Sequence, residues 1–127
     1  MSMIEDVHLT PEDEIDQRLY LVTLFDFYGA LLKENQRAAF EGSILEDLSL
    51  SEIAEEMEIS RQGVHDLVKR TCRQLESYEE RLRLVEKFQI IKSKIETLNQ
   101  RMMTYHNLPE EEAREIQDTL REILEEI

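Results

Sequence analysis

Two signals for the start of a helix stand only eleven residues apart in this chain, at Ser49 and Ser60. Glu52 follows Ser49 at the spacing of a capping box, in which the two residues satisfy each other's free backbone N–H groups. Ser60 is a second residue of the type that caps helices, and the segment between the two caps holds one short helix and a tight turn. The spacing therefore predicts a helix-turn-helix.

The apolar residues of this stretch follow helical spacing and predict a shared core for the two helices. The expected core residues are Ile53, Met57, Ile59, Val64, Leu67 and Val68. The small side chain of Ala54 suits the close approach of crossing helices. Glu58 occupies the turn, where we expect a left-handed backbone that Gly adopts at lower cost.

Glycine and proline are scarce, which favours long helices over loops. The 127 residues include three Gly and two Pro, and neither type occurs between Gly63 and Pro109. An all-α fold follows from this composition. The first six residues lack the pattern of a signal peptide, and no run of apolar residues is long enough to span a membrane. We therefore expect a cytoplasmic protein, in which the single cysteine, Cys72, is a packing residue and not a redox or metal-binding group.

Two further helices precede the predicted helix-turn-helix. The first begins with a cap and a proline at Thr10-Pro11 and runs to about Leu32, and Gly29 within it indicates a close crossing by another helix. Its expected buried stripe is Ile15, Leu19, Val22, Phe25, Tyr28 and Leu32, and it is widened by Leu21, Leu24, Phe27 and Leu31. The second spans about residues 34–45. Its expected inward residues are Ala38, Ala39, Ile44 and Leu45.

Beyond Arg61 the apolar residues recur in nearly alternating steps of four and three, which is a heptad pattern typical of coiled coils. The pattern is overwound between Leu82 and Ile91, and this leaves open a kink or break near Lys87. A last helix follows Pro109. Its apolar stripe is Ala113, Ile116, Leu120, Ile123, Leu124 and Ile127. This helix either folds back antiparallel on the preceding one or meets a second subunit.

This pattern divides the chain into a helix-turn-helix domain over residues 10–78 and a helical, coiled-coil-like dimerisation extension over residues 79–127. A homodimer is expected from the heptad pattern and the last helix.

No arrangement of catalytic residues is evident. His8, His65 and His106 are scattered, and the sequence has no zinc-protease motif, phosphate-binding glycine loop or serine elbow. The acidic runs lie on segments expected to be solvated helix faces, and no calcium-binding loop is present. We therefore expect a non-enzymatic protein without a cofactor or metal.

Charge is unevenly distributed along the chain. The net charge is −14, but residues 61–73 carry four basic residues and one acidic residue. The candidate nucleic-acid-binding residues at the second helix of the motif are Ser60, Arg61, Gln62, His65, Lys69, Arg70 and Arg73. Arg61 and Gln62 are suited to base edges, and the later basic residues to phosphates. The alternative is a solvated basic face that pairs with the chain's own acidic helices.

Four segments resemble the YlxM-like helix-turn-helix proteins of Gram-positive bacteria and mycoplasmas. They are the stretches LFDFYGALL from Leu24, EDLSLSEIA from Glu46, SRQGVHD from Ser60 and YEERL from Tyr78. The resemblance covers about residues 16–85. His65 stands where the family usually has Tyr.

The resemblance implies a DNA-binding fold similar to region 4 of bacterial sigma factors and a regulatory role in the signal recognition particle pathway. The ligand implied is DNA or the particle's RNA. The alternative is a protein-interaction module that binds the particle's GTPase without contacting nucleic acid.

Overall fold

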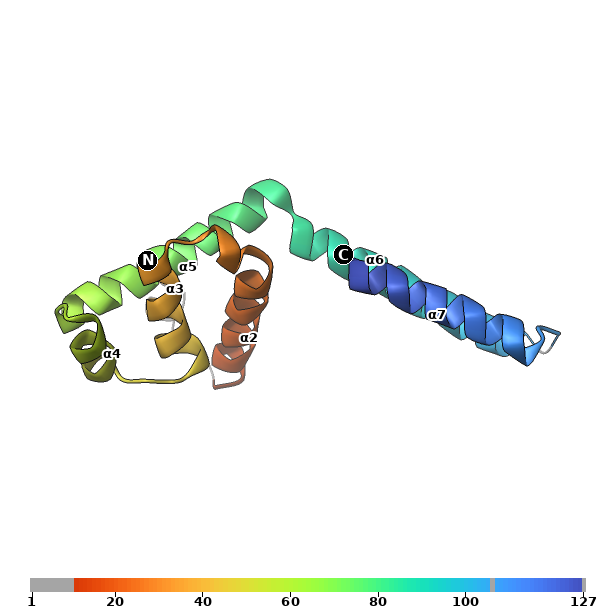
Figure 1. The fold of residues 1–127 in the computed structure, drawn as a ribbon, viewed down its shortest axis with the longest axis horizontal. Helices are drawn as coiled ribbons and strands as arrows, with labels where there is room; N and C mark the ends of the chain where they lie inside the picture. The colour runs from red at the N-terminus through yellow and green to blue at the C-terminus, as the bar shows by residue number, and fades with distance from the viewer. Residues whose placement is uncertain (1–10, 106, 127) are drawn as a thin grey trace. The chain divides into compact units, whose positions relative to one another are not determined.

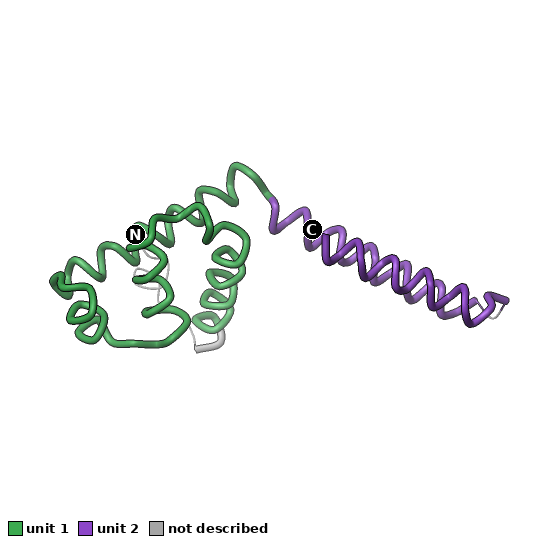
Figure 2. Tube along the Cα trace, viewed as in Figure 1, with its two compact units in different colours: residues 1–83 green, residues 84–127 purple. Residues whose placement is uncertain are grey.

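The computed structural model describes residues 11–105 and 107–126, and within these ranges every regular element is helical. The prediction of an all-α fold is confirmed. The chain forms two compact units that meet at Arg83 and Leu84 (Figure 2). Thr10, His8, His106 and Ile127, which figured in the sequence predictions, lie outside the described residues.

The first unit is built around one long helix, α5 (Arg61–Leu82), which contacts three shorter ones (Figure 1). These are α2 (Pro11–Tyr28), α3 (Glu34–Phe40) and α4 (Leu50–Met57). A 3-10 turn, η1 (Gly29–Leu31), follows α2, and a π-helical turn, η2 (Glu41–Leu45), follows α3. The most deeply buried large side chains come from all four helices. They are Leu24, Tyr28, Phe40, Ile53, Val64 and Leu75.

The buried face of α2 combines part of the predicted stripe with two of the residues expected to widen it. Ile15 and Leu19 are each 60% exposed, whereas Leu21 and Leu24 are buried with Tyr28 and Leu32. The helix is apolar around much of its circumference, so periodicity alone gives two overlapping stripes. In the folded unit α2 contacts α5, and the residues that it buries include Leu21 and Leu24.

An aromatic pair explains two further errors of the sequence predictions. The rings of Phe25 and Phe40 stack with centroids 4.6 Å apart. A Cβ at Gly29 would lie 3.2 Å from the Phe25 ring, so this glycine makes room for a side chain one turn earlier and not for a crossing helix. In α3 and η2, Phe40 is fully buried, whereas the expected core residues Ala38 and Leu45 are exposed.

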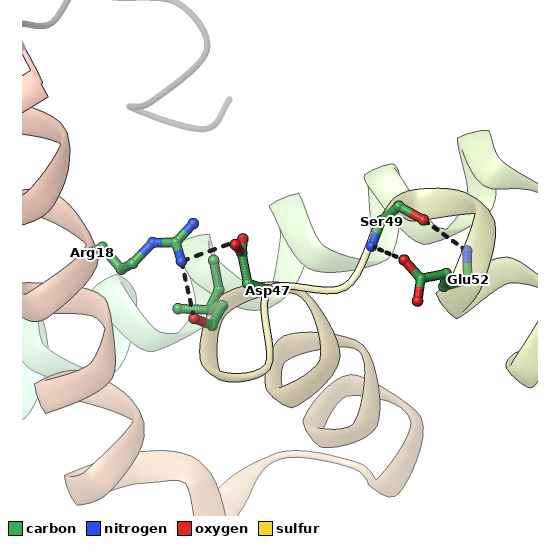
Figure 3. A network of polar contacts seen from close by, with 5 residues as sticks. Arg18, Asp47, Ser49 and Glu52 are labelled. Carbon is green, nitrogen blue, oxygen red and sulfur yellow. Dashed lines mark hydrogen bonds and ion pairs between the residues drawn. The ribbon is translucent and has the colours of Figure 1, made fainter.

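The predicted helix-turn-helix is present as α4 and α5. Ser49 Oγ accepts from the backbone N–H of Glu52, whose carboxylate accepts from the N–H of Ser49 at 3.2 Å, so the capping box is complete (Figure 3). Ser60 Oγ accepts from the N–H of Gly63 at 2.9 Å and begins α5. Glu58 has φ 58°, the left-handed conformation expected for the turn.

The core between α4 and α5 is formed by Ile53, Ala54 and Val64, with Met57 and Val68 partly buried against them. Ile59 was expected in this core but is 41% exposed. It follows the left-handed residue directly, and the turn takes it off the periodic face that places Ile53 and Met57 inward.

An ion pair joins α2 to the loop that precedes α4. Arg18 Nη1 donates to the carbonyl of Ile44 at 3.4 Å and lies 3.6 Å from the Asp47 carboxylate (Figure 3). Asp47 itself has φ 55°. The backbone N–H of Leu48 donates to the carbonyl of Gly42, which ties the loop to η2. These contacts set the start of α4 relative to the rest of the first unit.

The second unit is a hairpin of two antiparallel helices, α6 (Leu84–Thr104) and α7 (Glu110–Glu126), which lie side by side (Figure 1). Of the two arrangements that the sequence left open for the last helix, the folded-back one is observed. The heptad pattern is divided between two helices, because Arg83 takes a left-handed conformation with φ 55° and ends α5. The expected domain boundary at residues 78/79 lies inside α5. No helix among the described residues is long and apolar enough to cross a membrane.

Candidate nucleic-acid interface

The candidate residues lie along one side of α5, opposite the side that packs in the core. The buried residues of α5 are Val64, Leu67, Thr71, Cys72, Leu75 and Glu79. Arg61, Gln62, Arg70 and Arg73 are exposed, and His65 and Lys69 are half-buried. The Ser60 cap fixes the first turn of the helix, so the positions of Arg61 and Gln62 follow from a local hydrogen bond.

A hollow of about 720 Å³ lies where the helix-turn-helix brings the first turns of α4 and α5 together. Its lining residues are Leu50 and Ser51 from α4, and Ser60, Arg61, Gln62 and His65 from α5. The N-termini of both helices carry backbone N–H groups and the positive ends of helix dipoles. The sequence analysis missed Leu50 and Ser51, although their place directly after the Ser49 cap was a signal that could have identified them.

A second, smaller hollow of about 420 Å³ lies further along α5. It is lined by Asp66, Lys69, Arg70 and Arg73. Three of these four residues are basic, and within the described part of the chain the guanidinium groups of Arg61 and Arg70 form no hydrogen bond or ion pair. The basic residues are therefore grouped in a concave part of the surface, a shape suited to a phosphate-bearing backbone.

Asp66 is an acidic residue within this basic face. Its carboxylate accepts a hydrogen bond from the Gln62 side-chain amide at 3.0 Å and lies 3.6 Å from His65 Nδ1. Asp66 thus holds the Gln62 side chain against the helix. This bond uses one N–H of the Gln62 amide, and the second N–H and the carbonyl oxygen are the groups suited to an adenine edge.

The far end of the basic face is close to a carboxylate. Burial raises the pKa of Glu76, and the positive charge of Arg73 lowers it by a smaller amount. Arg73 therefore has an acidic neighbour within its own helix.

Over residues 11–105 and 107–126, no three His, Cys, Asp or Glu side chains converge as metal ligands. The thiol of Cys72 is buried.

Comparison with known proteins places the chain in a family. The sequence profile of a family described as "Putative helix-turn-helix protein, YlxM / p13 like" matches residues 15–117, which include both helices of the motif and most of the hairpin. The chain belongs to this family, UPF0122. The match confirms the resemblance found in the sequence and extends it beyond residue 85.

Curated UPF0122 proteins are about half identical to this chain. A relative from Caldanaerobacter subterraneus subsp. tengcongensis is 51% identical over 85 residues, which is 67% of this chain and 73% of the relative. One from Shouchella clausii is 49% identical over 62% of this chain and 72% of the relative. One from Bacillus cereus strain AH187 is 56% identical over 52% of this chain and 60% of the relative.

Proposed function

We propose that this UPF0122 protein is a non-enzymatic regulatory protein that binds duplex DNA as a homodimer, with α5 as the recognition helix. The observation that supports this most is the position of Arg61 and Gln62 in the first exposed turn of α5, beside the N-terminus of α4. In helix-turn-helix proteins the N-terminal residues of the second helix contact base edges, while the first helix crosses the backbone.

The residues divide into two roles. Arg61 is suited to a bidentate contact with guanine and Gln62 to one with adenine, so these two would determine sequence preference. Lys69, Arg70 and Arg73 would bind phosphates and position the helix. Ser60 acts through the cap that fixes the first turn of α5. His65 lies between the residues suited to base edges and the residues suited to phosphates.

The net charge of −14 does not oppose this proposal, because phosphate binding depends on local basic density and not on the average over the chain. The eight acidic residues of α7 lie in the other unit. We extend the proposal to a role in the signal recognition particle pathway on the family resemblance alone.

Fluorescence anisotropy with duplex DNA of random sequence, followed by selection of the bound pool, tests the proposal. The wild-type protein should bind with an affinity that falls as salt rises. Arg61→Ala and Gln62→Ala should each relax sequence preference at one or two positions, at a cost of about 1–3 kcal/mol on the selected site. Arg70→Ala should weaken binding to all sequences and reduce the salt slope by about one.

Arg114→Ala is the matched control, because Arg114 is an exposed arginine on α7 that forms an ion pair with Glu110 at 3.7 Å. It should leave binding and the salt slope unchanged. Equal losses from Arg114→Ala and Arg70→Ala would show attraction by overall charge and contradict the assignment of α5.

Two other results would indicate that the ligand is not duplex DNA. Binding to the particle's RNA that is unaffected by Arg61→Ala would indicate contacts to shape and phosphates, because the major groove of A-form RNA is too narrow for a helix. Absence of nucleic-acid binding together with co-elution of the particle's GTPase would identify a protein-interaction module.

A further inference from the structure

The α6–α7 hairpin buries only one part of its apolar surface. Val85, Ile95 and Met102 of α6 and Leu120 of α7 are buried. Six other apolar side chains, which we call the hairpin face, are between 37% and 68% exposed. They are Leu84, Ile91 and Leu98 of α6, Tyr105 directly after α6, and Ile116 and Ile123 of α7. Their spacing is seven residues within each helix, so on each helix they form one straight stripe along a coiled-coil edge.

Both stripes lie on the same side of the hairpin. Ile91 and Ile116 each precede a buried residue, Ile95 and Leu120, by four positions. In an antiparallel pair of helices, the edges that precede the buried residues lie together on one side, and the edges that follow them lie together on the other. The second side is visible here as one hollow of about 360 Å³, which is lined by Asn99 of α6 and by Gln117 and Leu124 of α7.

The two sides of the hairpin therefore differ in polarity. The side with the hollow presents Asn99, Gln117 and Arg121 beside its apolar residues. The hairpin face presents large apolar side chains from both helices. A contiguous apolar face of this kind on a two-helix unit marks an interaction surface.

The charged residues that border the hairpin face indicate what binds to it. Lys87, Lys94 and Arg101 recur every seven residues beside the α6 stripe, at its outer edge. The corresponding edge of α7 carries Glu112 and Glu126, with Thr119 between them. The face is thus bordered by cations along one helix and by carboxylates along the other, so it is complementary to a copy of itself turned by 180°.

The positions of these charges along the hairpin agree as well. Arg101 and Glu112 are equally far from the turn that connects the helices, and so are Lys87 and Glu126. A twofold axis parallel to the helices keeps each residue at its height and places α6 over α7 of the second copy. The cations of each copy then face the carboxylates of the other. The alternative twofold axis, perpendicular to the helices, would bring the cations of both copies together.

We propose that the hairpin face binds the same face of a second copy of this chain, forming an antiparallel four-helix bundle in which α6 of each copy packs against α7 of the other. Such an interface is isologous, and each contact occurs twice. This proposal depends on the homodimer stated in the proposed function. It does not depend on which nucleic acid the protein binds.

Light scattering of the full chain after gel filtration, without nucleic acid, tests the proposal. The expected mass is twice the 15.1 kDa of the chain. The double variant Leu98→Glu/Ile116→Glu places charges in the proposed core and should weaken the dimer by at least about a hundredfold. Ile90→Glu is the matched control, because Ile90 is 48% exposed on α6 but lies outside the hairpin face. This control should remain dimeric.

A charge exchange tests the pairing of the helices. Arg101→Glu should weaken the dimer about three- to tenfold, and adding Glu112→Arg should restore it. Restoration supports the packing of α6 on α7 of the partner, and failure to restore overturns that pairing.

Three results would overturn the proposed interface: a mass of 15.1 kDa for the wild-type chain at micromolar concentration, a dimer that persists in the double variant, or equal disruption by Ile90→Glu. Each can occur while DNA binding by α5 holds, and loss of DNA binding can occur in an intact dimer. A monomeric wild-type chain would also remove the homodimer from the proposed function, whereas the interface and the nucleic-acid ligand fail separately.

Discussion

The two units of this protein use apolar residues differently. In the first unit four helices enclose side chains such as Leu24, Phe40 and Val64, which are completely inaccessible to solvent. In the second unit two helices bury one seam and leave Leu98 51% exposed. Two helices cannot surround a side chain, whereas four can. The comparison predicts that the first unit is stable by itself and that the second gains stability from the proposed dimer.

The largest effect should come from the same substitution made in each unit. Leu75→Ala should lower the free energy of unfolding of the first unit by about 2–5 kcal/mol, because Leu75 is fully buried and its loss leaves a cavity. Leu98→Ala should cost less than about 1 kcal/mol in the monomer. Its cost should rise with protein concentration as the dimer forms.

Native-state hydrogen exchange measures both effects, because it resolves the helices of each unit. Equal losses from Leu75→Ala and Leu98→Ala in dilute solution would remove the distinction between the units.

A buried polar contact should give the next largest effect. Tyr28 is 1% exposed, and its hydroxyl donates to the carboxylate of Glu79, which is 5% exposed, at 2.5 Å. Tyr28→Phe removes the donor and leaves the carboxylate buried with one partner fewer, so unfolding in urea should show a loss of about 1–3 kcal/mol. Tyr105→Phe, at a side chain 68% exposed in the hairpin, should have no effect on the first unit.

Local signals predicted the motif because its geometry is determined by neighbours in sequence. The Ser49 and Ser60 caps, the core residues Ile53 and Val64 and the left-handed Glu58 all follow from residues within one or two turns. The same holds for the exposure of Arg61 and Gln62, which follows from the burial of Val64 one turn away.

The sequence predictions were wrong where contacts between residues far apart in the sequence determine which side chains are buried. Phe40 is buried because it stacks on Phe25, and the choice between two stripes on α2 depends on its contacts with α5. The break at Arg83 carries no Gly or Pro to mark it. Leu50 joins the candidate interface only because the turn brings the first residues of α4 beside those of α5. The spacing of residue types along the sequence does not contain this information.

Glu58 and Arg83 both have a left-handed backbone, the first in a turn inside the first unit and the second at the junction between the units. Substituting each by glycine compares the two sites. Glu58→Gly should stabilise the first unit by up to about 1 kcal/mol, because Gly adopts φ 58° without the steric penalty of an L-residue. Arg83→Gly relieves the same strain at φ 55° but removes a positive charge at the C-terminal end of α5, where the helix dipole favours a cation, so its gain should be smaller. Thermal unfolding measures both, and a loss of stability in Glu58→Gly would contradict the strain argument.

The smallest effect should be the dependence on pH contributed by Glu76 of the first unit. Burial raises the pKa of Glu76 above its ordinary value of 4.5, so the folded state holds the proton more tightly than the unfolded state does. This contribution to stability is complete below the unfolded pKa and is lost as the pH rises through the folded pKa. Glu76→Gln should therefore stabilise the protein at neutral pH and flatten its stability profile above pH 4.5.

Glu122→Gln changes an exposed carboxylate of α7 and serves as the control in the hairpin. A second measurement separates burial from a general charge effect. Burial and the Glu79 charge raise the pKa of Tyr20 most, and the Glu76 charge raises it further, so ultraviolet titration should show a lower Tyr20 pKa in Glu76→Gln. If Glu122→Gln gave the same stability gain and the same tyrosine titration, relief of overall negative charge would explain both, and the difference in burial between the units would have no part in it.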